Sequence, residues 1–102
     1  MSFNELELNV IRWSEARGII QNSQPWAQYI KAVSKMGELG DAILKKDRAA
    51  TIDGLGDVLV CLINVAAILD LDLTHCLGAA YDEIKHRKGY LNKDGVFVKE
   101  QA

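Results

Sequence analysis

Four acidic side chains lie at helical spacing around two short segments of the sequence, "GELGD" and "GLGD". Glu38 and Asp41 are three residues apart, and Asp53 and Asp57 are four apart. Residues at these spacings share one face of a helix, so each pair is expected to form a column. Carboxylates that gather repel one another unless a cation joins them, and oxygen ligands suit Mg²⁺. The alternative interpretation is a solvated polar face with pairs such as Lys35–Glu38.

Glycines accompany both acidic columns, at positions 37, 40, 54 and 56. A glycine inside a helix costs about 1 kcal/mol relative to alanine. Four of them beside acids therefore predict that two helix backbones approach closely there, or that a bulky group must fit. If the two helices pack antiparallel through these glycines, the four acids point toward one another.

Four helices are expected to position these residues, over residues 3–17, 25–46, 48–69 and 73–88. Their predicted N-caps are Ser2, Asn22 or Ser23, Asp47 and Asp72, and Gly18 and Gly89 end the first and last. Residues 19–24 are expected to be a connection. The helix over 48–69 is apolar nearly all round in its second half, which predicts a buried central helix.

The segment after residue 89 has the chemistry of a turn at Asn92–Gly95, between Tyr90–Leu91 and Val96–Val98. This pattern predicts a small hairpin or an arm that reaches a partner subunit. The expected fold class is therefore all-α, with a four-helix protomer and a short C-terminal hairpin or arm.

Length and composition favour a single domain over residues 1–102. A chain this short can bury only a modest core, so assembly into an oligomer would bury additional apolar surface. The net charge of −2 gives no basic face, so nucleic acid is not an expected partner. The longest apolar run contains Asn64 and is expected to be too short to span a membrane. The polar N-terminus is unlike a signal peptide, which predicts a cytoplasmic protein.

The segments "MGELGDAILKKD", "TIDGLGDVLVCLINVAAILDLDL", "EIKHRKG" and "GVFVKE", in this order, resemble the MazG-like all-α nucleoside triphosphate pyrophosphohydrolase superfamily. The similarity covers roughly residues 5–100 and is greatest to short, stand-alone phage and bacterial members. It implies hydrolysis of an NTP or dNTP between the α and β phosphates. It also implies Mg²⁺ or Mn²⁺ held by four acids, and a homodimer or tetramer of helical protomers with nucleotide in a cleft.

The motif implied by this resemblance is E-x-x-E on one helix and E-x-x-D on the next. Its second and last acids fall on Glu38 and Asp57, whereas its other two positions fall on Lys35 and Gly54. The expectation is a nucleotide pyrophosphohydrolase whose activity is impaired. The alternative is a catalytically inactive homologue that acts as a nucleotide- or protein-binding module, and a helical dimerisation module without a ligand is a third interpretation.

Two arrangements of the site follow from these replacements. In one, Glu38 and Asp57 hold a metal ion, and Asp41 and Asp53 stand in for the missing ligands. In the other, the Lys35 ammonium replaces the charge of the metal by pairing with Glu38 and Asp57, and no metal cofactor is needed.

Five further residues are candidates for nucleotide contacts. Lys85, Arg87 and Lys88 could bind phosphate, or they could complement the helix dipole at the end of their helix. Trp13 could stack on a base, as the resemblance implies, or belong to a core or interface. Asn64 could contact the base or form a bond across a subunit interface.

Overall fold

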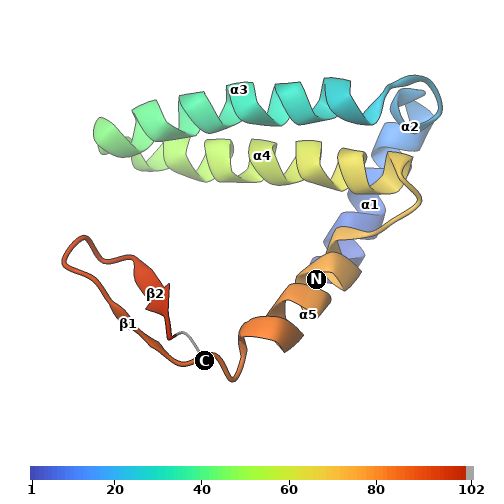
Figure 1. The fold of residues 1–102 in the computed structure, drawn as a ribbon. Helices are drawn as coiled ribbons and strands as arrows, with labels where there is room; N and C mark the ends of the chain where they lie inside the picture. The colour runs from blue at the N-terminus through green and yellow to red at the C-terminus, as the bar shows by residue number, and fades with distance from the viewer. Residues whose placement is uncertain (101–102) are drawn as a thin grey trace.

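The structure is a computed structural model that describes residues 1–100, and these residues form five helices and one hairpin (Figure 1). The elements are α1 (Phe3–Ala16), α2 (Ile19–Asn22), α3 (Pro25–Leu44), α4 (Arg48–Ile68), α5 (Leu73–Ile84), β1 (Gly89–Leu91) and β2 (Phe97–Lys99). The all-α class, the four long helices and the hairpin are confirmed.

Three of the predicted N-caps are confirmed by side-chain hydrogen bonds. The hydroxyl of Ser2 accepts from the backbone N–H of Glu5 at 3.1 Å, which begins α1. Asp47 accepts from the N–H of Ala50 at 3.0 Å and begins α4. Asp72 accepts from the third N–H of α5 at 2.6 Å. In each case a short polar side chain satisfies a helix donor that has no partner within the helix.

The segment between α1 and α3 differs from the prediction in two ways. Residues expected to be a plain connection include the single-turn helix α2, which begins after Gly18 at φ +74°, a backbone conformation that glycine adopts without strain. The N-cap of α3 is Gln24, not Asn22 or Ser23, and its side chain makes no capping bond. Pro25 follows directly, and its ring already fixes the helical φ at the first position.

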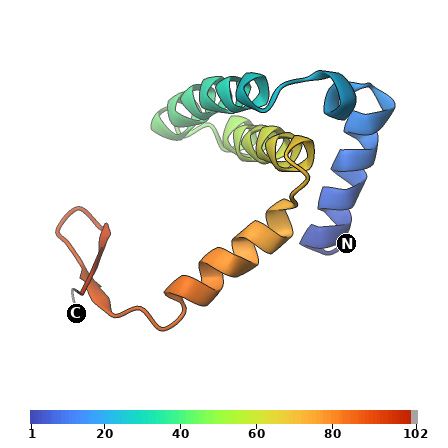
Figure 2. The same ribbon diagram turned by 45° about the vertical axis from the view of Figure 1, so that its right-hand side comes forward.

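Helices α3 and α4 lie antiparallel and side by side along their length, as Figures 1 and 2 both show. Helix α1 packs against α4, and α5 contacts α1 and α4 and runs away from α3. The hairpin pairs Tyr90 with Val98 in antiparallel register, and within residues 1–100 it packs on no helix. The α3–α4 pair is therefore the scaffold that positions the acidic columns.

The protomer buries few apolar side chains, and most of them are small. Those that are buried are Ala32, Ala42, Cys61, Ile63 and Ala66. The radius of gyration is 16.1 Å, whereas a compact domain of this length has about 13 Å. Large apolar side chains such as Trp26 and Tyr81 are more than half exposed. The protomer is thus an open arrangement of helices with much apolar surface.

The expectation that no segment is long enough to span a membrane is wrong for α4. By length and composition alone α4 could cross a bilayer, because it has 21 residues and a window of mean hydropathy 1.8. The central helix of a protein core passes the same test, and a single such helix is weak evidence for a membrane. Within the protomer α4 packs against α3 and α1, with Gly54, Cys61 and Asn64 among its buried residues, but only 28% of its apolar stretch is buried.

Candidate functional site

The side chains of Glu38 and Asp57 face each other across the α3–α4 pair, and the ammonium of Lys35 lies between them. The Lys35 Nζ atom is 3.5 Å from Glu38 Oε2 and 3.7 Å from Asp57 Oδ2. The Lys35 side chain is 30% exposed, so it lies along the helix pair and does not extend into solvent. The expected pairing of Lys35 with both acids is confirmed.

The two carboxylates favour the charged form of this lysine. Glu38 first, and Asp57 second, raise the pKa of Lys35 above its usual value. The ordinary pKa of lysine is already near 10.4, so the upward direction keeps this side chain charged at neutral pH. The site therefore holds a permanent positive charge between two acids.

Gly54 lies one turn before Asp57 on α4 and is buried against α3. A Cβ atom at position 54 would lie 3.2 Å from the Cα of Leu39, and equally close to two of its side-chain atoms. The expected close approach is thus confirmed at Gly54. It is wrong within the protomer for Gly37, Gly40 and Gly56, where an added Cβ would meet no atom within 4 Å.

The other two acids of the predicted columns lie outside the triad. Asp41 and Glu38 line a separate hollow of about 240 Å³ near the turn between the helices. Asp53 is exposed on α4 and takes part in none of the ion pairs among residues 1–100. Neither Asp41 nor Asp53 is brought to the point between Glu38 and Asp57.

The donor set between α3 and α4 does not fit a resident divalent cation in this arrangement. Only Glu38 and Asp57 meet there, and the Lys35 ammonium already forms an ion pair with each. Gly54 offers no ligand atom. Among the described residues, no three His, Cys, Asp or Glu side chains gather at one point. A hard cation such as Mg²⁺ would have to displace a like charge to reach these oxygens.

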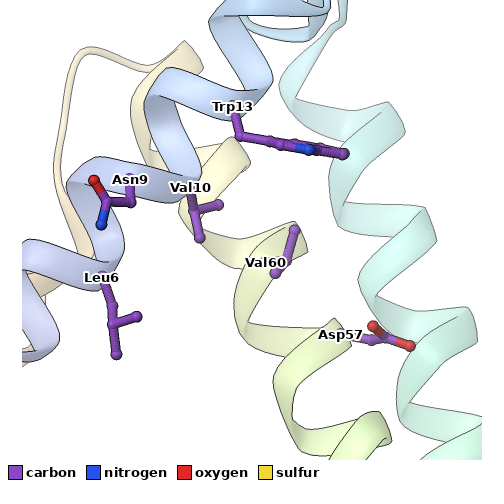
Figure 3. A pocket seen from close by; sticks show the side chains of 6 residues that line it. All are labelled: Leu6, Asn9, Val10, Trp13, Asp57 and Val60. Carbon is purple, nitrogen blue, oxygen red and sulfur yellow. The ribbon is translucent and has the colours of Figure 1, made fainter. Parts of the chain in front are cut away.

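A cavity of about 460 Å³ opens beside Asp57, between α1 and α4 (Figure 3). Its lining is mainly apolar and consists of Leu6, Asn9, Val10, Trp13, Asp57 and Val60. In Figure 3 the Trp13 indole extends from α1 toward α3, and the Asp57 carboxylate lies further along the same opening. The volume is in the range of small-molecule sites, with one aromatic and one acidic group in its wall.

The Trp13 ring is held in place by Arg17, one turn along α1. The guanidinium carbon of Arg17 lies over the indole, 4.1 Å from its ring centroid. The same group donates a hydrogen bond of 3.2 Å to the backbone carbonyl of Trp13. A cation on an aromatic face is attractive, so this contact orients the ring and covers one side of it.

Asn64 belongs to a buried polar network within the protomer. Its Oδ1 atom accepts a 2.6 Å hydrogen bond from Ser14 Oγ, and its Nδ2 atom donates to Gln28 Oε1 at 3.3 Å. Gln28 in turn donates to Ser23 at 3.1 Å. Asn64 is 3% exposed, and both its side-chain oxygen and its side-chain nitrogen have hydrogen-bond partners. These bonds connect α4 to α1 and to α3.

The three basic residues predicted to bind phosphate lie just beyond the last residue of α5, Ile84. Lys85 pairs with Asp82 at 3.1 Å. Figures 1 and 2 show that this end of α5 points away from the α3–α4 pair. Within one protomer, Lys85, Arg87 and Lys88 are therefore not brought to the ion triad.

Sequence reasoning missed Glu7, which is a buried acid with a clear structural task. Its carboxylate accepts hydrogen bonds from the backbone N–H groups of Leu73 and Thr74 and from the Thr74 hydroxyl, the last at 2.5 Å. The side chain is 2% exposed. Glu7 thus joins α1 to the N-terminus of α5, where an anion is favourable.

The chain is similar to a known protein in sequence and to a solved structure in fold. No family model matches the chain. A 62-residue segment, 61% of the chain, is 31% identical to an uncharacterised 18.2 kDa protein of Haemophilus phage HP1, and this segment spans 38% of that protein's length. The MazG-like pyrophosphohydrolase of cyanophage S-2L superimposes with a TM-score of 0.72 at 19% identity, over 100% of this chain and 96% of that one. The chain has the MazG-like fold. The cyanophage protein is described as bound to dGDP and three catalytic Mn²⁺ ions per active site.

The MazG-like fold confirms, at the level of architecture, the resemblance drawn from the sequence. The superposition includes the whole MazG-like fold of this chain, α5 and the hairpin as well as the α3–α4 pair.

Proposed function

We propose that this chain is a MazG-like nucleotide pyrophosphohydrolase of impaired activity. The reaction joins an NTP or dNTP with water, breaks the bridging P–O bond between the α and β phosphates, and yields a monophosphate and pyrophosphate. The observation that carries the proposal is that Trp13 and Asp57 line one cavity beside the ion triad. A base and a phosphate chain could then occupy neighbouring parts of the same opening.

The impairment follows from the charge and ligand count at the triad. The sequence resemblance predicts acids at positions 35 and 54, whereas this chain has Lys35 and Gly54. A change from glutamate to lysine alters the local charge by two units. The ammonium disfavours a divalent ion at this position, and Gly54 supplies no ligand to offset it. Because removal of one charge-stabilising group typically costs an enzyme at least about 100-fold in rate, a loss of about 100-fold is expected.

The direct test incubates the chain with each NTP and dNTP in Mg²⁺ or Mn²⁺ and measures monophosphate and pyrophosphate. We expect slow formation of both products in equal amounts, which Asp57→Ala abolishes. Exposed Asp94→Ala in the hairpin turn is the matched control and should leave the rate unchanged. Release of inorganic phosphate without pyrophosphate would contradict the proposed reaction.

A second candidate is a catalytically inactive homologue that binds a nucleotide or a protein. The specific observation in its favour is that Lys35 already neutralises Asp57 at 3.7 Å. The two candidates separate in one experiment, because the inactive homologue would show a nucleotide-induced rise in melting temperature and no product at any enzyme concentration.

Trp13 is proposed as the base-stacking residue, with the base on the face opposite Arg17. Stacking of a base on an aromatic side chain is worth about 1–3 kcal/mol, so Trp13→Ala should weaken nucleotide binding by about tenfold to 100-fold. Trp13→Phe should retain most of the affinity, and Trp26→Ala, outside the cavity, should retain all of it. Fluorescent-nucleotide titration measures each value. Equal losses for Trp13→Ala and Trp26→Ala would contradict this assignment.

Asn64, predicted from sequence to contact the base, is proposed to act through its neighbours instead. Its bond to Ser14 fixes the helix turn that carries Trp13, the adjacent residue. The network therefore supports the orientation of the proposed stacking face.

We also propose that the chain works as a homodimer or tetramer in the cytoplasm, without membrane or nucleic-acid partners. The exposed apolar side chains of α3 and α5 and the large radius of gyration support an assembly, because a second copy would cover this surface. In such an assembly the end of α5 could carry Lys85, Arg87 and Lys88 to the cleft of another protomer.

A further inference from the structure

We propose that the Lys35 ammonium is a built-in cation of the α3–α4 cleft, which keeps divalent metal ions away from Glu38 and Asp57. The proposal concerns the chain before any nucleotide binds. It therefore holds independently of whether the chain hydrolyses nucleotides.

The geometry places one charged group where a bridging cation would lie. Lys35 Nζ is within 4 Å of an oxygen of each acid, at 3.5 and 3.7 Å, and the two acids come from different helices. Among residues 1–100, the other ion pair joins Lys85 to Asp82, so Lys35 alone neutralises these two acids. The ammonium thus bridges α3 and α4 as a metal ion would.

The charge balance favours the lysine over a divalent ion. Glu38 and Asp57 together carry two negative charges, and Lys35 returns one positive charge. A divalent ion entering the same space would meet a repulsion from the ammonium twice as large as that of a monovalent ion at the same distance. Because Gly54 supplies no carboxylate, the entering ion would gain no additional ligand to offset this repulsion.

Displacement of the lysine into solvent is the route by which a metal could still enter. Lysine side chains are flexible enough for this movement. The Lys35 side chain is 30% exposed, whereas Asp57 is 38% and Glu38 66% exposed, so departure of the ammonium would leave both carboxylates with water alone as a partner. The alternative is an ordinary surface ion pair, which contributes little and would yield readily to a divalent ion.

The test is a titration of the full, nucleotide-free chain with Mn²⁺. Binding is measured by isothermal titration calorimetry and by the electron paramagnetic resonance signal of free Mn²⁺. The variants are Lys35→Glu, Lys35→Met and the control Lys31→Glu. Lys31 is exposed one turn earlier on α3 and belongs to none of the ion pairs, so its substitution makes the same charge change outside the triad. Circular dichroism and elution volume confirm that each variant is folded.

We expect Lys35→Glu to bind Mn²⁺ about 100-fold more tightly than the wild-type chain, because one repulsive contact becomes an attractive one. Lys35→Met should show a smaller gain, and Lys31→Glu should resemble the wild type. Wild-type binding as tight as that of Lys35→Glu would overturn the proposal, and so would a folded Lys35→Glu without a gain. If Lys35→Glu does not fold, Lys35→Met decides: a gain over wild type supports the proposal, and no gain overturns it. Because no nucleotide is present, failure of the proposed hydrolysis would not alter these results.

Discussion

Replacement of Glu7 by alanine is expected to lower the free energy of unfolding by about 3 kcal/mol. The Glu7 carboxylate accepts three hydrogen bonds, and a hydrogen bond to a charged group contributes about 1.5–3 kcal/mol. The bonds are not additive, because one carboxylate serves all of them. The loss leaves the N–H groups of Leu73 and Thr74 without their acceptor at a half-buried helix end. Asp72 caps the same helix, but its carboxylate is bonded to the N–H of His75 and does not replace Glu7.

Urea denaturation at matched protomer concentration measures this effect. Glu15→Ala is the control, because Glu15 is exposed on the same helix and its side chain makes no hydrogen bond or ion pair among residues 1–100. Glu7→Gln should lie between the two, since an amide keeps one acceptor and adds donors that face other donors. Hydrogen exchange should show that α5 opens more often in Glu7→Ala. Equal stability of Glu7→Ala and Glu15→Ala would show that α5 is held by other contacts.

Local signals in the sequence were sufficient to predict most of the helix boundaries. Ser2, Asp47 and Asp72 cap helices through bonds to residues three positions later, so the information lies within one turn. The same locality made the i,i+3 pair of Lys35 and Glu38 predictable. Residues 19–22 were not predicted as a helix because a single turn has too few positions to show a periodic pattern.

Contacts between residues distant in sequence could not be predicted in the same way. Glu7 bonds to a backbone N–H 66 residues away, and nothing near Glu7 in the sequence marks it as a cap for another helix. Asn64 was recognised as a polar residue in an apolar helix, but its partners Ser14 and Gln28 depend on how three helices meet. The pairing of Lys35 with Asp57 could be predicted because antiparallel packing through the glycines had already placed Glu38 and Asp57 on facing sides of two helices.

Restoration of the missing acid at position 54 is expected to destabilise the protein even though glycine is a poor helix former. Exchange of an interior glycine for another residue normally gains up to about 1 kcal/mol in helix propensity. At Gly54, however, the new Cβ would lie 3.2 Å from the Cα and two side-chain atoms of Leu39. Because a backbone atom is among these neighbours, a rotamer change cannot relieve the contact, and the two helices must separate. Overpacking of this kind costs about 1–3 kcal/mol.

Gly56→Glu is the matched comparison, since it makes the same substitution two positions further along α4 where a Cβ would meet no atom within 4 Å. We expect Gly54→Glu to be about 2 kcal/mol less stable than Gly56→Glu in urea denaturation, from the packing cost at the first position and its absence at the second. Equal stabilities would show that α3 and α4 adjust at little cost, and that glycine at position 54 is not required by packing.

The double variant Lys35→Glu with Gly54→Glu tests whether four acids between α3 and α4 bind a metal ion despite the packing cost at position 54. Without metal, four acids at positions 35, 38, 54 and 57 would repel one another, so the melting temperature should fall below that of either single variant. Addition of Mn²⁺ should raise it again, because a ligand that binds only the folded state stabilises it by RT ln(1 + [L]/Kd). The pair Lys35→Glu with Gly56→Glu has the same composition and should recover less, since residues 54 and 57 share a helix face whereas residue 56 does not. Equal recovery in both double variants would place the restored metal site on residue 35 alone and would contradict the alignment of position 54 with the motif.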